Sequence, residues 1–250
     1  ISMESGRITS SDTTLKLSDA GDRPSSDMKS LSPSSGSSAI LISDVRAGYG
    51  SREVIHGVTL NILVGERVML VGDNGAGKST LLKLIMGSLH ASHGTIAITG
   101  KHVATASERL QSGIGYAPQG GRLIRSLTGH EHLQIAAAVA SRYGRHPALG
   151  REFQKAFPEI AAISTMRAAE LSAGQRSLLA LAVAFTTEPS ILIVDEPAAG
   201  LSRNIRNRVF TFLDSAWSSP DRTTVIVEHE DIEFPCRTLC LEQGRLVSCL

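Results

Sequence analysis

The stretch GDNGAGKST, residues 72–80, has the residue types and spacing to hold a phosphate chain. It fits the pattern G-x-x-x-x-G-K-[ST], with an apolar run before it and helical apolar spacing after it. Its glycines let the backbone curl around an anion, and the helix start adds the positive end of its dipole. Lys78 is expected to reach the β- and γ-phosphates, and the Ser79 hydroxyl to bind Mg²⁺. A plain glycine-rich turn with an exposed lysine is the alternative, but it leaves both flanks unexplained. The predicted phosphate-binding residues are Gly72, Asp73, Asn74, Gly75, Ala76, Gly77, Lys78, Ser79 and Thr80.

An acidic pair follows the apolar run ILIV, residues 191–194. Such a run is typical of a buried parallel strand, and ligands of open α/β sheets lie beyond the carboxyl ends of these strands. Asp195 is therefore predicted to bind Mg²⁺, and Glu196 to polarise an attacking water as general base. Asp-Glu-Pro alone would also fit an acidic turn. Together with a phosphate-binding loop, it favours hydrolysis of a nucleoside triphosphate.

A second candidate anion site is LSAGQ, residues 171–175, a polar turn that opens a strongly apolar helix. Helix N-termini attract anions through their N–H groups and their dipole. One chain would then carry two phosphate-binding helix starts about a hundred residues apart, and the second needs an explanation.

Strands and helices alternate around these residues. Apolar runs at 67–72, 190–197 and 222–229 predict buried parallel strands, and alternating residues at 57–66 predict an antiparallel strand. We expect a helix over 78–89, an Ala-rich helical insertion at about 120–175, and a hairpin turning at Gln243–Gly244. The predicted fold class is α/β, with a parallel core sheet, an antiparallel β subdomain and a helical insertion.

Composition narrows the function classes. Among 250 residues the net charge is +1, which gives no basic field for nucleic acid. The cysteines, Cys236, Cys240 and Cys249, support neither a disulfide framework nor a zinc site. Apolar runs such as LLALAVAF, residues 178–185, are far shorter than the roughly 18 residues that span a bilayer. Residues 1–38 are rich in Ser, Thr, Asp and Gly, and we expect a disordered arm or linker there, with the folded domain over 39–250.

The second helix start identifies a family. LSAGQ resembles the signature sequence of ABC-type ATPases, usually written LSGGQ. Other family elements follow in the same order: an aromatic at Tyr49, the Q-loop at Gln119, the D-loop AAGLS at 198–202 and the switch histidine at His229. The resemblance covers about residues 40 to 247.

The resemblance implies a P-loop NTPase of ABC type that uses ATP and Mg²⁺. Tyr49 would stack on adenine, Gln119 would bind Mg²⁺ and couple the site to a transmembrane partner, and His229 would contact the γ-phosphate. It also implies a head-to-tail dimer with a second ABC ATPase subunit, identical or not. In that dimer each signature closes the partner's site, which explains the second helix start. The signature residues are Leu171, Ser172, Ala173, Gly174 and Gln175.

A single cassette with no heptads and no zinc pattern resembles a transporter subunit that docks on separate permease subunits at the cytoplasmic face of the membrane. The stretches GYAPQGGRLIRSLTGHEHL and DEPAAGLS are similar to the cassettes of branched-chain amino-acid uptake systems. Those systems also use a solute-binding protein. Related cassettes for urea or other amides share these sequence features. A regulatory or nucleic-acid-linked ABC ATPase, and a degraded cassette that binds but barely hydrolyses ATP, are the alternatives.

The chain departs from the family pattern at three places. Ala173 stands where the family has glycine, and it would be strained if that position required a positive φ. Ser202 replaces the aspartate common at the end of the D-loop. The segment from His229 to Gly244 is about one helical turn shorter than usual, and Pro235 would break a helix there.

Overall fold

The structure, a computed structural model, describes residues 36–197, 199–215, 219–228 and 234–248. The chain divides into two units, Ile1–Ser34 and Ser35–Leu250, and only the second is described below. The predicted arm or linker at 1–38 therefore lies almost wholly outside the described residues. None of the helices in the described part of the chain is long and apolar enough to cross a membrane.

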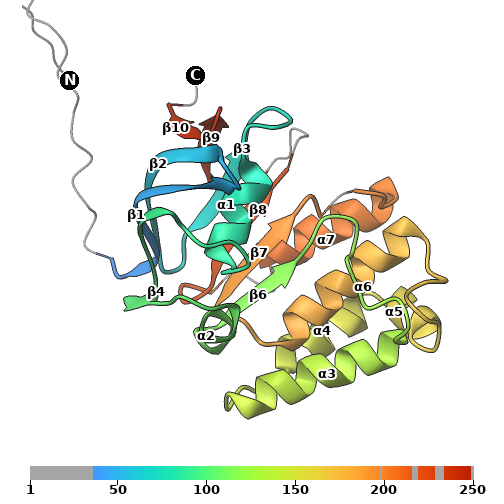
Figure 1. Ribbon diagram of the computed structural model, residues 1–250. Coiled ribbons are helices and arrows are strands. Elements are labelled where there is room, and N and C mark those ends of the chain that lie inside the picture. The colour runs from blue at the N-terminus through green and yellow to red at the C-terminus, as the bar shows by residue number, and fades with distance from the viewer. Residues whose placement is uncertain (1–35, 198, 216–218, 229–233, 249–250) are drawn as a thin grey trace, which may run out of the picture. The chain divides into compact units, whose positions relative to one another are not determined.

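An antiparallel sheet opens the domain (Figure 1). Its strands are β1 (Ser38–Tyr49), β2 (Arg52–Leu63), β4 (His93–Ile98) and β5 (Lys101–His102), in the order β2-β1-β4-β5. Apolar residues of β1 such as Ile40 and Ile42 are buried, and Leu41 between them is exposed. This alternation covers one face of the sheet and leaves the other to solvent, as the pattern at 57–66 predicts for β2.

The second sheet is parallel except at one edge. Its strands are β3 (Arg67–Val71), β6 (Ile114–Ala117), β7 (Ile191–Asp195), β8 (Thr223–Val227), β9 (Arg237–Glu242) and β10 (Arg245–Val247). The order is β10-β9-β3-β8-β7-β6. Every residue of β7 and β8 is buried, which explains their continuous apolar sequences. The carboxyl ends of β3, β6, β7 and β8 meet at one edge of this sheet, where the predicted site residues follow them.

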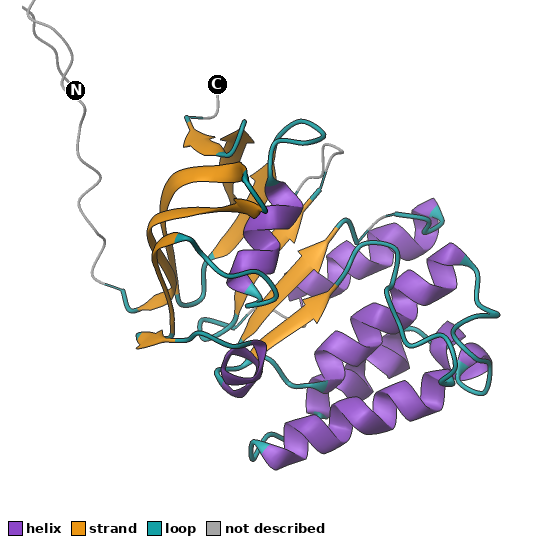
Figure 2. Cartoon of the chain, viewed as in Figure 1, coloured by secondary structure: helices purple, strands orange, loops and turns teal. Residues whose placement is uncertain are grey.

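Helices occupy two places in the domain (Figure 2). They are α1 (Lys78–Ile85), α2 (Ala106–Gln111), α3 (Gly129–Arg142), α4 (Ala148–Ala156), α5 (Glu159–Ile163), α6 (Ala173–Thr186) and α7 (Arg203–Ser215). Helix α1 shares one hydrophobic core with both sheets. Helices α3 to α5 lie within the predicted helical insertion at about 120–175, and α6 begins at the end of that range. The ring centroids of Phe153 of α4 and Phe185 of α6 lie 4.7 Å apart.

The chain ends in the predicted hairpin. Glu242 pairs with Arg245 across the two-residue turn Gln243–Gly244, whose φ angles of 43° and 75° are those of a type I′ turn. Cys236 is a free thiol, whereas Cys240 is disulfide-bonded, a bond that the cysteine spacing did not predict. The α/β fold class, with its parallel core sheet, antiparallel subdomain and helical insertion, is confirmed.

Candidate functional site

The glycine-rich loop connects β3 to α1. Gly77 is the N-cap of α1 and has a φ of 108°, a left-handed conformation that a side chain would strain. Lys78 is only 7% exposed, and its Nζ donates to the carbonyls of Gly72, at 2.6 Å, and Asp73, at 3.0 Å. The loop therefore wraps around its own lysine. Ser79 and Thr80 follow it in the first turn of the helix, where Ser79 is exposed and Thr80 is buried.

Charges around Lys78 oppose the effect of its burial. Removal from water lowers the pKa of the ammonium, while the nearby carboxylates of Glu196, Asp195 and Asp73 raise it. Two of these, Asp195 and Glu196, are the acidic residues that the sequence places at the end of a different strand. The fold brings them to the loop because β3 and β7 are both neighbours of β8 in the sheet.

Asp195 is the last residue of β7 and is 6% exposed. Burial raises the pKa of its carboxyl, and the charge of Glu196 raises it further. The Tyr116 hydroxyl lies 3.5 Å from Asp195 Oδ2 and opposes this shift. Burial and Asp195 raise the pKa of Tyr116 to about 12, so the phenol keeps its proton and can donate to the carboxylate.

Glu196 has a strained backbone, with a φ of 50°. Its N–H donates to the Val227 carbonyl at 2.8 Å, which anchors the residue to β8. Gln119 follows β6 and donates through Nε2 to Glu196 Oε2 at 2.5 Å. The structure thus gathers four of the predicted residues, Lys78, Gln119, Asp195 and Glu196, at one edge of the sheet.

Tyr49 lies at the end of β1 and is 47% exposed. Lys83 of α1 donates to its hydroxyl at 3.0 Å and lies 5.2 Å from the ring centroid. The hydrogen bond from Lys83 is the main cause that lowers the pKa of Tyr49. Tyr49, whose ring is predicted to stack on adenine, therefore lies beside the first two turns of α1, the helix that follows the glycine-rich loop.

The signature stretch starts α6, and Figure 1 shows this helix among the helical group rather than beside α1. Ser172 is the N-cap and forms a capping box with Gln175: the Gln175 N–H donates to Ser172 Oγ at 3.2 Å, and the Ser172 N–H donates to Gln175 Oε1 at 2.8 Å. Ala173 is the first helical residue and does not have a positive φ, so it carries no left-handed strain. Leu171 is buried, while Ser172 and Ala173 are exposed.

The D-loop packs against the signature within the same chain. A Cβ on Gly174 would lie 2.3 Å from the Gly200 carbonyl oxygen, so this glycine is required by close backbone contact. Ser202 accepts the Ile205 N–H at 3.4 Å and thereby caps α7, a function that the aspartate common in the family would also perform.

His229, the predicted switch histidine, lies outside the described residues, as do the four residues after it in the shortened segment that runs to Gly244. Sequence reasoning did not single out Tyr116 or Lys83, whose positions depend on which strands and helices become neighbours. The one available signal for Tyr116 is its place three residues before Gln119, in the stretch GYAPQ.

Comparison with known proteins identifies the family. The pattern of the ABC transporter family matches residues 55–199. The chain is 32% identical over 227 residues to the Nod factor export ATP-binding protein I of Sinorhizobium fredii, covering 87% of this chain and 64% of that protein. It is 33% identical over 219 residues to the protein of the same name from Rhizobium meliloti, covering 84% and 63%. The chain thus spans just under two thirds of the length of these two relatives.

Solved structures agree with the fold. The ATP-binding subunit of an ABC transporter superposes with a TM-score of 0.70 at 27% identity, covering 83% of this chain and 88% of that one. A bacterial Atm1-family ABC exporter with ATP bound gives a TM-score of 0.71 at 26% identity, covering 85% of this chain and 39% of that one. The chain belongs to the ABC transporter family and carries its ATP-hydrolysing domain.

Proposed function

We propose that this chain is the ATP-binding subunit of an ABC transporter, with the triphosphate held by residues 72–80. The convergence of Lys78, Gln119, Asp195 and Glu196 at one sheet edge carries the proposal. The lysine stands where it can exchange its two backbone carbonyl partners for phosphate oxygens. Tyr49, beside the same helix, offers a ring for the base.

The donor set fits Mg²⁺. A hydroxyl at Ser79, a carboxylate at Asp195 and an amide oxygen at Gln119 are hard oxygen ligands, the type that this ion prefers. Bound there with ATP, Mg²⁺ would neutralise charge on the β- and γ-phosphates. The Tyr116 hydroxyl orients Asp195 by a hydrogen bond. Gln119 is hydrogen-bonded to Glu196 until the Gln119 side chain rotates toward the nucleotide. Glu196 then takes the proton of the attacking water.

A second subunit completes the site in this proposal. The exposed helix start at Ser172 and Ala173 would face the γ-phosphate held by the partner, with Gly174 close behind, and His229 would contact the same phosphate in its own chain. ATP favours the closed dimer because it binds both surfaces at once, and hydrolysis removes that preference. Two chains thereby form two complete sites.

The surface for the permease subunits is proposed to be the helical insertion. Ile124 and Ile135 are 58% and 50% exposed, and the Ile124 N–H bonds to His132 of α3, which joins the segment after Gln119 to this helix. A movement of Gln119 would therefore be transmitted through this short segment to the exposed surface at Ile124 and Ile135. On this proposal the protein acts at the cytoplasmic face of the membrane.

Two directions of transport have support. The word export in the names of the relatives favours outward movement of a solute, which we adopt as the first candidate. The stretch after Gln119 and the sequence DEPAAGLS favour uptake of branched-chain amino acids with a solute-binding protein, the second candidate. ATP-driven accumulation in inside-out membrane vesicles supports export, and accumulation in right-side-out vesicles supports uptake.

Steady-state hydrolysis tests the core of the proposal. Glu196→Gln keeps the shape of the side chain but removes the base, so we expect ATP binding to persist and turnover to fall at least about 100-fold. Glu152→Gln, at an exposed position on α4, is the control and should hydrolyse ATP normally. Normal turnover in Glu196→Gln contradicts the assignment. Stimulation by DNA or ribosomes favours the non-transport alternative, and negligible wild-type turnover favours a degraded cassette.

A further inference from the structure

The hairpin turn Gln243–Gly244 contacts the phosphate-binding loop directly. The Gly244 N–H donates to the Ala76 carbonyl at 2.8 Å. On the same side, a Cβ on Gly72 would lie 2.2 Å from the Leu241 carbonyl oxygen, and one on Gly77 would lie 3.6 Å from Gly244 Cα. The hairpin and the loop therefore pack backbone against backbone, although about 170 residues separate them in the sequence.

The same turn is fixed to the antiparallel sheet on its other side. The Gly244 carbonyl accepts the His56 N–H of β2 at 2.9 Å, and Arg245 Nη1 donates to the His56 carbonyl at 3.2 Å. A Cβ on Gly244 would lie only 1.9 Å from the Val54 carbonyl oxygen. Gly244 thus uses its N–H on the loop and its carbonyl on β2, in a space that admits no side chain.

The parallel sheet holds the hairpin in register. Strand β9 pairs with β3, with Cys240 opposite Val71, the last strand residue before the loop. Leu241, which follows, is completely buried. Figure 1 shows β9 and β10 beside β2 and β3, where both sheets approach the loop. The turn therefore cannot shift without moving either the strand that leads into the loop or the opposing sheet.

Peptide geometry links the Gly244–Ala76 hydrogen bond to the direction of the next N–H group in the loop. In a trans peptide the carbonyl of one residue and the N–H of the next point in opposite directions. Because the Ala76 carbonyl is held on Gly244, the Gly77 N–H must point to the opposite side of the loop. N–H groups at this helix start are the donors that a phosphate requires.

We propose that the turn Gln243–Gly244 is a positioning element for ATP binding, and that it fixes the Ala76–Gly77 peptide in the orientation that binds phosphate. The inference rests on the proposed function of residues 72–80. It adds to that function a residue that touches no phosphate and acts through the backbone of the loop.

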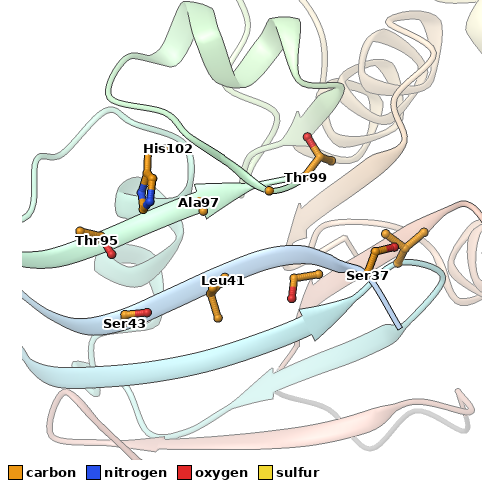
Figure 3. Close-up of a pocket in the computed structure, with 10 residues that line it drawn as sticks. Ser37, Leu41, Ser43, Thr95, Ala97, Thr99 and His102 are labelled. Carbon is orange, nitrogen blue, oxygen red and sulfur yellow. The ribbon is translucent and has the colours of Figure 1, made fainter. Parts of the chain in front are cut away.

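The chain contains a matched control. The turn Thr99–Gly100 between β4 and β5 has φ angles of 47° and 75°, against 43° and 75° at Gln243–Gly244. A Cβ on Gly100 would have no heavy atom within 4 Å. This turn borders a 610 Å³ groove on the outer face of the antiparallel sheet, shown with Thr99 and His102 in Figure 3. Alanine therefore carries the same backbone strain at both glycines and collides at only one.

The experiment compares the Kd for ATP and the KM and kcat for hydrolysis in wild type, Gly244→Ala and Gly100→Ala. We expect Gly244→Ala to raise Kd and KM at least about tenfold, which is the effect of a lost hydrogen bond plus a displaced backbone, with kcat nearly kept. Gly100→Ala should bind as wild type does. Equal ATP affinity in all three proteins overturns the inference. If wild type itself does not bind ATP, the proposed function fails instead.

Hydrogen exchange gives a second test that needs no variant, should Gly244→Ala not fold. ATP binding should tighten the loop against the turn and slow exchange of the Gly244 amide at least about fivefold, since that amide is bonded to Ala76. The Gly100 amide is the reference and should not change. Equal exchange of the Gly244 amide with and without ATP contradicts the inference.

Discussion

Two helix starts in this domain are predicted to bind phosphate, and they are built differently. Helix α1 begins at Gly77, an N-cap with no side chain and a left-handed backbone, and its first residue Lys78 is buried. Helix α6 begins at Ser172, whose side chain forms a reciprocal capping box with Gln175 on an exposed surface. The start of α1 is enclosed, since Gly77 and Lys78 are buried, and no side chain caps it. The start of α6 is open, since Ser172 and Ala173 are exposed, and a side chain caps it.

The difference explains why one chain carries both. A helix start without a capping side chain leaves its N–H groups to a ligand, and α1 has a buried lysine and nearby carboxylates to define that ligand. The capping box instead provides hydrogen-bond partners at the start of α6 without a ligand. The signature can therefore stay folded when no phosphate from another chain is bound. In the proposed function, the first start forms a site within the chain, and the second forms a surface for a partner.

The largest effect is expected at the enclosed start. Lys78→Ala removes the charge proposed to contact the phosphates, and we expect ATP affinity to fall at least about 100-fold, because a charge-assisted contact in a buried site is lost. Fluorescence titration with an ATP analogue measures it. A Lys78→Ala protein that binds ATP as tightly as wild type would disprove the role of residues 72–80.

A smaller effect, of another kind, is expected at the exposed start. Ser172→Ala removes a cap and should cost about 1 kcal/mol of stability. ATP binding to the single chain should persist, while turnover at saturating ATP should fall roughly tenfold because the partner's phosphate loses a donor. Thr105→Ala removes the equivalent capping box of α2 and is the matched control, with a similar stability loss and normal turnover. Equal turnover in the two variants would remove the distinction between the helix starts.

When no nucleotide is bound, the ionised carboxylate of Asp195 should destabilise the folded domain. Burial raises the pKa of Asp195 in the folded state, so this state keeps a proton that the unfolded chain has lost. Stability should then decrease as pH rises from the ordinary aspartate pKa through the raised one. Asp195→Asn should raise the Tm at neutral pH by roughly 2–4 °C, about 1 kcal/mol in a domain of this size, while Mg²⁺-dependent turnover is lost. The Tm gain should vanish in acid, and a gain independent of pH would refute this origin.

The smallest effect is expected at the departure from the family sequence. Ala173 is helical, so restoring glycine relieves no strain and adds backbone freedom. Ala173→Gly should lower stability by about 0.5–1 kcal/mol and leave turnover within roughly twofold of wild type. A large gain in turnover would mean that the signature needs a left-handed backbone in the assembled dimer.

The sequence predicted what local chemistry determines. The loop at 72–80, the acidic end of β7 and the two-residue turn at Gln243–Gly244 each have characteristic residue types, and the structure contains all three elements. It did not predict that Tyr116 would meet Asp195 or that Gly244 would hold Ala76. Those contacts depend on strand order and register, which link residues 79 and 168 positions apart and leave no local pattern.

In the proposed function, two chains share each ATP. The most direct measurement is the molar mass of Glu196→Gln by analytical ultracentrifugation, with and without ATP, since hydrolysis cannot then release the dimer. We expect a monomer without ATP and a dimer with it, and a monomer in both conditions when Ser172→Arg is added to Glu196→Gln. A Glu196→Gln protein that binds ATP and stays monomeric would contradict it.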